Sequence, residues 1–125
     1  MPSQNCKFNS AQANPDWPGV YDIDPKELWE KRKEVVIIDV RRPDEYTGEL
    51  GHVPGSQLIV LDNLGEKVSS LPKDKTIVFV CRSGARSARA SLLATQEGIL
   101  SCFNMKGGMI LWNQLKLEVE GRLGG

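Results

Sequence analysis

The chain alternates between short apolar runs and longer segments in which apolar residues recur at helical spacing. Two runs rich in β-branched residues, 35–40 and 76–81, are typical of strands buried on both faces of a sheet. Further extended segments are predicted at residues 20–23, 56–61 and 100–105. Helices are predicted between them, over residues 25–33, 43–46, 62–70, 85–97 and after Gly108. Strands that alternate with helices predict an α/β domain, with a parallel sheet and helices on both of its faces.

The helix predicted over residues 85–97 is the longest. Gly98 follows it directly, and glycine is the residue most often found just past a helix end. From their spacing, we expect Ala88, Leu92 and Thr95 to share its buried face.

The length of 125 residues predicts a single domain. We assign residues 20–120 to this domain, residues 1–19 to a polar, loosely ordered N-terminal arm and residues 121–125 to a C-terminal tail. Trp17, near the end of the arm, is expected to dock on the domain, because an indole ring gains little by remaining in water.

Charge and cysteine content exclude several classes of protein. Sixteen Lys and Arg residues balance sixteen Asp and Glu residues, so the net charge of zero predicts neither nucleic acid nor a membrane surface as a partner. No segment reaches the roughly eighteen apolar residues of a membrane-spanning helix. Three cysteines without a C-x-x-C pair, together with one histidine, predict neither a disulfide framework nor a zinc site. The polar N-terminus lacks the apolar stretch of a secretory signal, so a reduced, cytoplasmic setting is expected, although an exported chain that has lost its signal would have the same pattern.

The candidate chemistry is concentrated in the loop after the run 76–81. In parallel sheets ligands bind beyond the carboxyl ends of strands, where this loop begins. Cys81 ends the run and a helix begins within a few residues, so free N–H groups and the positive end of the helix dipole lie near its sulfur. Arg82 and Arg86 add two positive charges, and each of these effects favours the thiolate. We therefore identify Cys81 as a nucleophile at the bottom of an anion-binding cup, which is formed by Arg82, Ser83, Gly84, Ala85, Arg86 and Ser87.

The two other cysteines receive different interpretations. Cys102 lies in an apolar strand segment, which predicts an inert core residue. Cys6 lies in the polar arm, where it is either an unreactive free thiol or an auxiliary, resolving thiol.

Several motifs of the chain resemble those of the rhodanese family. They are IDVR at 38–41, DEY at 44–46, GHVPGS at 51–56, CRSGARS at 81–87, and Gly107-Gly108 followed by Trp112. The resemblance covers residues 20–120 in the order that the family has. It implies a single three-layer domain with a five-stranded parallel sheet flanked by helices. It also implies a sulfurtransferase whose cysteine cycles through a persulfide, without a metal or an organic cofactor.

Loop length separates sulfur-transferring rhodaneses from their phosphatase relatives. The loop from Cys81 to Arg86 has the C-x4-R spacing of the sulfur-transferring branch, whereas the phosphatase branch has one residue more. A shorter loop narrows the ring of N–H groups around a single sulfur atom. Arginines at both loop positions resemble thiosulfate-using members, because two guanidinium groups suit a dianionic donor. We therefore expect a small anionic sulfur donor such as thiosulfate, and a thiol, a thiol protein or cyanide as the acceptor.

Two alternatives belong to other functional classes. A cysteine phosphatase or arsenate reductase would form a phospho- or arseno-cysteine. The short loop and the lack of a candidate general-acid aspartate beside it argue against that reaction. A non-catalytic rhodanese module would act as a binding domain, but inactive modules typically lose the cysteine, which this chain has together with both arginines.

Other polar residues near these motifs are expected to be structural. Asp39 and Arg41 could support the catalytic loop, but we expect Asp39 to bond to the backbone and Arg41 to pair with Glu45. The single histidine, His52, lies in a stretch that matches a structural loop of the family, so a structural role is expected for it. Met109 and Trp112 belong to the last predicted helix and are expected to pack in the core.

Overall fold

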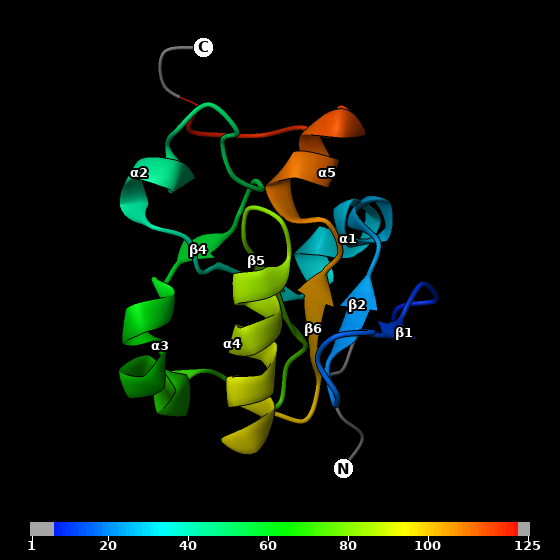
Figure 1. Cartoon of the computed structure of the whole chain (residues 1–125), viewed down its shortest axis with the longest axis vertical. Coiled ribbons are helices and arrows are strands. Elements are labelled where there is room, and N and C mark those ends of the chain that lie inside the picture. Colours follow the sequence, from blue (N-terminus) through cyan, green and yellow to red (C-terminus); the bar gives the residue numbers. More distant parts are fainter. Residues whose placement is uncertain (1–6, 123–125) are drawn as a thin grey trace.

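The computed structural model describes residues 7–122, which form a central six-stranded sheet (Figure 1). The strands lie in the order β1-β2-β6-β5-β3-β4. They are β1 (Gln12–Ala13), β2 (Tyr21–Ile23), β3 (Val36–Asp39), β4 (Gln57–Leu58), β5 (Ile77–Val80) and β6 (Cys102–Met105). The strands from β2 to β4 in this order are parallel, which confirms the predicted α/β fold with a five-stranded parallel sheet. The short strand β1 was not predicted, and it pairs with β2 in the antiparallel direction.

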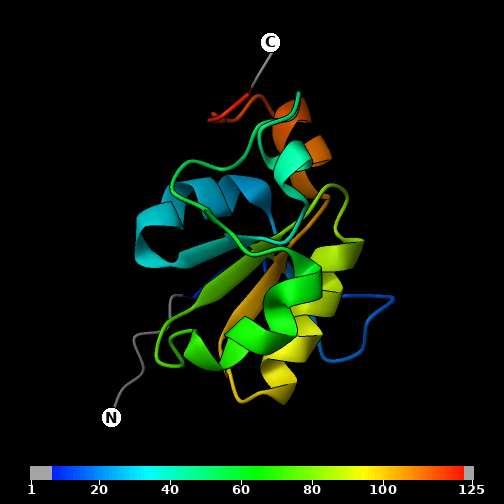
Figure 2. The same ribbon diagram turned by 90° about the vertical axis from the view of Figure 1, so that its left-hand side faces the viewer.

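Helices cover both faces of the sheet and complete three layers (Figure 2). They are α1 (Pro25–Lys31), α2 (Pro43–Tyr46), α3 (Leu61–Lys67), α4 (Ala85–Gln96) and α5 (Gly108–Gln114), with 3-10 turns at Arg32–Glu34 and Val68–Ser70. Helices α1 and α5 pack together on one face, while α3 and α4 pack together on the other. Within residues 7–122, no helix has both the length and the apolar character needed to cross a membrane.

Alternate residues of the central strands point to opposite faces of the sheet and fill two hydrophobic clusters. In β5, Ile77 and Phe79 belong to the cluster under α3 and α4. Val78 and Val80 belong to the cluster under α1 and α5. All four side chains are fully buried, which explains why this strand is apolar at every position.

The buried face of α4 differs from the prediction. Small residues face the sheet and allow the helix to approach β5 and β6; they are Ser87, Ala88, Ala90, Ser91 and Ala94. Of the three residues predicted on this face, Ala88 is buried, whereas Leu92 is half-buried and Thr95 is exposed. The prediction failed because it assumed that Leu92, as the largest apolar residue of the three, would pack in the core. Leu92 instead lines a groove with Trp17.

Residues 7–19 contact the domain through particular side chains. Phe8 is buried in the cluster under α1 and α5, where its ring meets Phe103 edge to face at a centroid distance of 5.3 Å. The Glu27 carboxylate of α1 accepts hydrogen bonds from the Ser10 backbone N–H at 2.8 Å and from its hydroxyl at 2.6 Å. This part of the arm is therefore bound to the domain by the apolar packing of Phe8 and by the hydrogen bonds from Ser10 to Glu27.

Trp17 lies half-buried beside α4, as expected, and lines a groove with Leu92 and Leu93. Cys6 and its predicted role lie outside the described residues.

Phe8→Ala is expected to lower the free energy of unfolding by about 3 kcal/mol, because the truncation leaves a cavity where the arm joins the core. Chemical unfolding of the variant and the wild type measures this difference. Leu100→Ala is the control, since Leu100 is 88% exposed and its truncation should change stability by less than about 0.5 kcal/mol. Equal stability of Phe8→Ala and the wild type would contradict the packing of the arm.

Candidate active site

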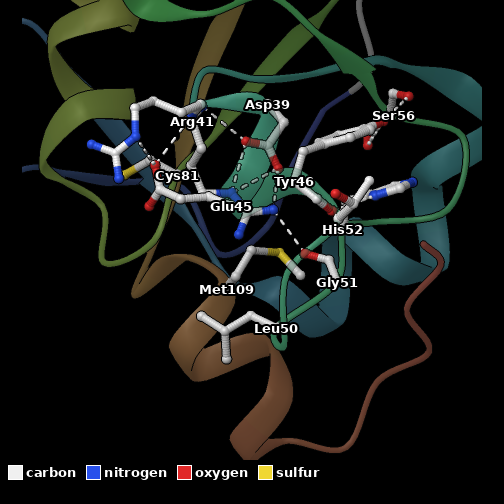
Figure 3. A network of polar contacts seen from close by, with 12 residues as sticks. Asp39, Arg41, Glu45, Tyr46, Leu50, Gly51, His52, Ser56, Cys81 and Met109 are labelled. Carbon is white, nitrogen blue, oxygen red and sulfur yellow. Dashed lines mark hydrogen bonds and ion pairs between the residues drawn. The ribbon is translucent and has the colours of Figure 1, made fainter. Parts of the chain in front are cut away.

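The candidate nucleophile lies at the carboxyl end of β5, where Cys81 follows the strand directly (Figure 3). Its side chain is 1% exposed. The Cys81 sulfur accepts a hydrogen bond from the Gly84 backbone N–H at 3.0 Å and lies 3.2 Å from the Ser87 hydroxyl oxygen. The fold thus brings the predicted nucleophile together with a backbone N–H of the loop and a hydroxyl of the first turn of α4.

Gly84 gives the loop its shape. It is the N-cap residue of α4 and has a φ of +112°, a conformation that residues with side chains rarely adopt. This turn directs the Gly84 N–H at the sulfur before the helix begins. The position therefore requires glycine for its backbone conformation, and the sulfur gains a donor at the positive end of a helix.

The start of α5 supports the same loop from behind. The backbone N–H of Met109 donates to the Cys81 carbonyl oxygen at 2.9 Å, and that of Ile110 donates to the Arg82 carbonyl oxygen at 3.0 Å. Gly108 has a φ of +58°, and a Cβ atom there would overlap the carbonyl groups of Cys81 and Arg82. The second glycine of the Gly-Gly motif therefore permits a backbone contact that fixes the orientation of the loop.

Arg86 is bound by a carboxylate from another element. Its guanidinium donates to both oxygens of Glu45, in α2, at 2.7 and 2.8 Å. These hydrogen bonds from Arg86 hold the pKa of Glu45 down at about 2, although partial burial acts in the opposite direction. The expectation that Arg41 pairs with Glu45 is wrong, because Glu45 binds Arg86 in the loop of residues 81–87, the candidate catalytic loop.

Asp39 and Arg41 form a buried pair at the end of β3 (Figure 3). The Arg41 guanidinium donates to Asp39 through Nε and through one terminal nitrogen, at 2.9 and 2.8 Å. Asp39 also accepts the Arg41 backbone N–H at 3.0 Å, as expected, and Arg41 donates to the Gly51 carbonyl oxygen at 2.7 Å. The pair therefore ties the end of β3 to the loop around Gly51.

A cavity of about 190 Å³ lies beside the catalytic loop. Its lining includes Arg41, Asp44, Glu45, Glu49, Leu50 and Arg82. Arg82 is exposed at this cavity, which places one of the two predicted anion-binding arginines where a soluble ligand can reach it. The expectation that no candidate acid lies beside the loop is wrong, since Asp44 and Glu49 are on the cavity wall.

Three further residues of the predicted cup line a second cavity of about 300 Å³. Ser83, Gly84 and Ala85 line it from the loop, and Trp17 and Lys106 line it from the arm and from the segment after β6. The catalytic loop is therefore bordered by α2 on one side and by the N-terminal arm on the other.

A family model described as a rhodanese-like domain matches residues 24–115. The chain belongs to the rhodanese-like family. The match includes the loop from Cys81 to Ser87 and the Gly107-Gly108 motif, so the recognised domain contains every part of the site described above except the arm.

Several relatives of this rhodanese domain are named sulfurtransferases. The sulfurtransferase of Allochromatium vinosum is 32% identical over 103 residues, which cover 80% of this chain and 94% of that protein. The probable adenylyltransferase/sulfurtransferase MoeZ of Mycobacterium tuberculosis is 37% identical over 95 residues, or 72% of this chain, but the chain spans only 24% of that protein's length. A crystal structure of a rhodanese-related protein from Thermoplasma volcanium is similar with a TM-score of 0.74 and 31% identity, covering 81% of this chain and 98% of that one.

The single histidine of the rhodanese domain has structural contacts. His52 stacks on Tyr46 with ring centroids 3.6 Å apart, and its Nδ1 atom lies 2.8 Å from the Tyr46 carbonyl oxygen. Met109 and Trp112 are fully buried, as expected for core residues, and the Trp112 indole N–H donates to the Glu118 carbonyl oxygen at 2.8 Å. These contacts support the structural roles predicted for all three residues.

Cys102 is partly exposed on β6, and its thiol lies 3.4 Å from the Ser91 carbonyl oxygen. Burial raises the pKa of this thiol, which favours the uncharged form. A carbonyl acceptor and a raised pKa both disfavour a reactive thiolate, in agreement with the inert role predicted for Cys102.

Two polar residues of the site were missed from sequence. Asn104 lies buried in β6 and bonds to both Ser87 and Asp22 of β2. A buried amide inside an apolar strand was the available signal, because such a group requires polar partners. Asp22 gave no comparable signal, since it lies in a short segment where polar and apolar residues alternate.

The Glu45 carboxyl is expected to titrate at a pH of about 2, below its ordinary value of 4.5, because Arg86 binds the charged form. The stabilisation from this pair is therefore complete above pH 4.5 and is lost as the pH falls toward 2. NMR of the side-chain carboxyl carbon measures the midpoint. In Arg86→Ala it should rise toward 4.5, whereas Arg89→Ala, which removes an exposed arginine of the same helix, should leave it unchanged. An unchanged midpoint in Arg86→Ala would contradict the pairing.

Proposed function

We propose that this domain moves sulfane sulfur from a small anionic donor such as thiosulfate to an acceptor thiol or to cyanide, through a persulfide on Cys81. The observation that supports this most directly is the hydrogen bond from the Gly84 N–H to the Cys81 sulfur, 3.0 Å long and located at the start of α4. A negatively charged sulfur is stabilised there by the N–H group and by the helix dipole. The sulfurtransferase names of the relatives support the same class of reaction.

In the first step, the Cys81 thiolate attacks the outer sulfur of thiosulfate. A bond forms between these two sulfur atoms, and the bond from the outer sulfur to the sulfonate sulfur breaks. Sulfite leaves with the electron pair of the broken bond. Cys81 then has a terminal sulfur with a negative charge, which N–H groups of residues 82–86 stabilise.

In the second step, cyanide or an acceptor thiolate attacks the terminal sulfur. The persulfide bond breaks, its electron pair returns to Cys81, and thiocyanate or an acceptor persulfide leaves. Both steps are substitutions at sulfur, so neither requires a general base once the thiolate has formed. The acceptor thiol can belong to a small molecule or to a second protein.

The two arginines of the loop have different roles in this proposal. Arg82 is exposed at the cavity beside the loop, so its guanidinium can bind the sulfonate oxygens of thiosulfate. Arg86 donates to both oxygens of Glu45, so it fixes the loop against α2. The sequence predicted that both arginines bind the sulfur donor. Because Arg86 is paired with Glu45, we assign donor binding to Arg82 alone.

Phosphoryl transfer is the main alternative reaction. Asp44 and Glu49 on the cavity wall could donate a proton to a leaving group, so loop length is the remaining argument against a phosphatase. The short loop brings the Gly84 N–H to 3.0 Å from the sulfur itself. The C-x4-R spacing resembles the sulfur-transferring branch of the family, whose shorter loop suits one additional sulfur atom better than a tetrahedral phosphate, and this favours sulfur transfer. A purely binding role is disfavoured because Cys81 and its donors are all present.

Cys81→Ser is expected to lower kcat/KM for thiocyanate formation from thiosulfate and cyanide by more than about 1,000-fold, because a hydroxyl cannot form the persulfide. Cys102→Ser is the control and should retain most turnover, since its thiol bonds to backbone within the fold. Full turnover by Cys81→Ser would contradict the mechanism. Rapid hydrolysis of p-nitrophenyl phosphate by the wild type would instead favour the phosphatase alternative.

Arg82→Ala is expected to lower kcat/KM for thiosulfate about tenfold and to affect an uncharged organic persulfide much less, because a charge-assisted hydrogen bond is lost only with the anionic donor. Arg86→Ala should lower kcat/KM for the two donors by the same factor, since it loosens the loop. Steady-state kinetics with both donors test this split. The reverse pattern would show that Arg86 binds the anion.

A further inference from the structure

The Ser87 hydroxyl lies among three acceptors, although a hydroxyl has only one proton to donate. Its oxygen is 3.2 Å from the Cys81 sulfur and 3.3 Å from the Gly84 carbonyl oxygen, and it makes a shorter bond to Asn104 Oδ1. Ser87 is fully buried. The direction of this one proton therefore decides whether the sulfur receives a second hydrogen bond in addition to that from Gly84.

Asp22 determines which end of the Asn104 amide faces Ser87. The Asn104 Nδ2 group donates to Asp22 Oδ1 at 2.9 Å. Because an ionised carboxylate can only accept hydrogen bonds, it selects the amide orientation that points the carbonyl oxygen at Ser87. Asp22 and Asn104 are register partners in β2 and β6, so both side chains lie on the same face of the sheet.

The N-terminal arm binds the other side of the Asp22 carboxylate. Asn14 Nδ2 donates to its two oxygens at 3.0 and 3.2 Å. The Asn14 side-chain oxygen accepts the backbone N–H groups of Asp16 and Trp17, which fixes the amide in turn. A relay of hydrogen bonds therefore runs from the arm through Asn14, Asp22 and Asn104 to Ser87, whose hydroxyl oxygen lies beside the Cys81 sulfur.

We infer that Asp22 and Asn104 are positioning residues that draw the Ser87 proton toward Asn104 and thereby keep the Cys81 sulfur nucleophilic. The inference rests on the proposed role of Cys81. A thiolate with fewer hydrogen bonds is the stronger nucleophile, although it forms at higher pH. If Asn104 turned over, its NH2 group would donate to the Ser87 oxygen, and Ser87 would donate its proton to the sulfur. The thiolate would then form at lower pH and react more slowly.

Charged side chains border the loop on both sides. On the side of α2 they are Arg41, Asp44, Glu45, Glu49 and Arg82, with Asp39 and Arg86 close to the same site. On the side of the arm they are Asp16, Asp22 and Lys106. Within residues 7–122, Asn104 bonds to Asp22 and not to Asp16, which is exposed in the same cavity. Neutralising Asp16 therefore removes a negative charge from this cavity without breaking the hydrogen bond between Asp22 and Asn104, so it serves as a control for the loss of charge at Asp22.

Asp22→Asn tests the relay, because it keeps the size of the side chain and removes the carboxylate that orients Asn104. The pH of half-maximal alkylation of Cys81 by iodoacetamide should fall by about one unit, since Ser87 can then donate to the thiolate. The limiting rate at high pH should fall about threefold. Peptide mass spectrometry follows Cys81 separately from the other cysteines. Asp16→Asn should lower the midpoint by less than about a third of that amount, because an exposed charge is screened.

Ser87→Ala tests whether the serine transmits the effect. In that background, Asp22→Asn should shift the midpoint no more than Asp16→Asn does. Asn104→Leu removes both ends of the amide and should reproduce the shift of Asp22→Asn; circular dichroism checks that each variant folds. Equal shifts in Asp22→Asn and Asp16→Asn, or a full shift of Asp22→Asn without the Ser87 hydroxyl, would overturn the inference.

This experiment distinguishes failure of the relay from failure of the proposed function. Alkylation reports the state of the Cys81 sulfur whether or not the protein transfers sulfur. Absence of thiosulfate turnover in the wild type would contradict the proposed function alone. Identical alkylation midpoints in the wild type and Asp22→Asn would contradict the relay alone.

Discussion

The geometry of the site depends on a pair of backbone hydrogen bonds, through which the start of α5 binds the carbonyl groups of the candidate catalytic loop. Two N–H groups of α5 donate to the Cys81 and Arg82 carbonyl oxygens at 2.9 and 3.0 Å. A side chain at Gly108 would prevent this approach. With its carbonyl groups held on this side, the loop directs the Gly84 N–H at the sulfur of the candidate nucleophile.

Two elements that are distant in sequence then hold the loop from opposite sides. Helix α2 binds it through the pair of Glu45 and Arg86, and the arm reaches it through Asp22 and Asn104. The first interaction places the Glu45–Arg86 ion pair close enough to Cys81 to interact with its charge. The second orients Asn104, which in the inferred relay accepts the proton of Ser87. The N-terminal arm, which is polar in sequence, thereby contributes to the surroundings of the Cys81 sulfur.

The sequence was sufficient to predict the parallel sheet, the helices and the position of Cys81, because these depend on local patterns of apolar residues and on glycine. It was insufficient for the pairing of charges. Glu45 accepts the backbone N–H of its sequence neighbour Arg42, but the guanidinium that binds both of its oxygens is that of Arg86, since the folded sheet brings α2 to the loop. Likewise, Asp22 meets Asn104 only through the register of β2 and β6. Such contacts depend on tertiary geometry, and a local pattern cannot reveal them.

The central claim is that Cys81 holds the transferred sulfur, and mass spectrometry of the protein after incubation with thiosulfate tests it most directly. The wild type should gain the mass of one sulfur atom, located on the peptide that contains Cys81, and cyanide should remove it with release of thiocyanate. An unchanged mass, or a sulfur atom located on the peptide that contains Cys102, would contradict the account.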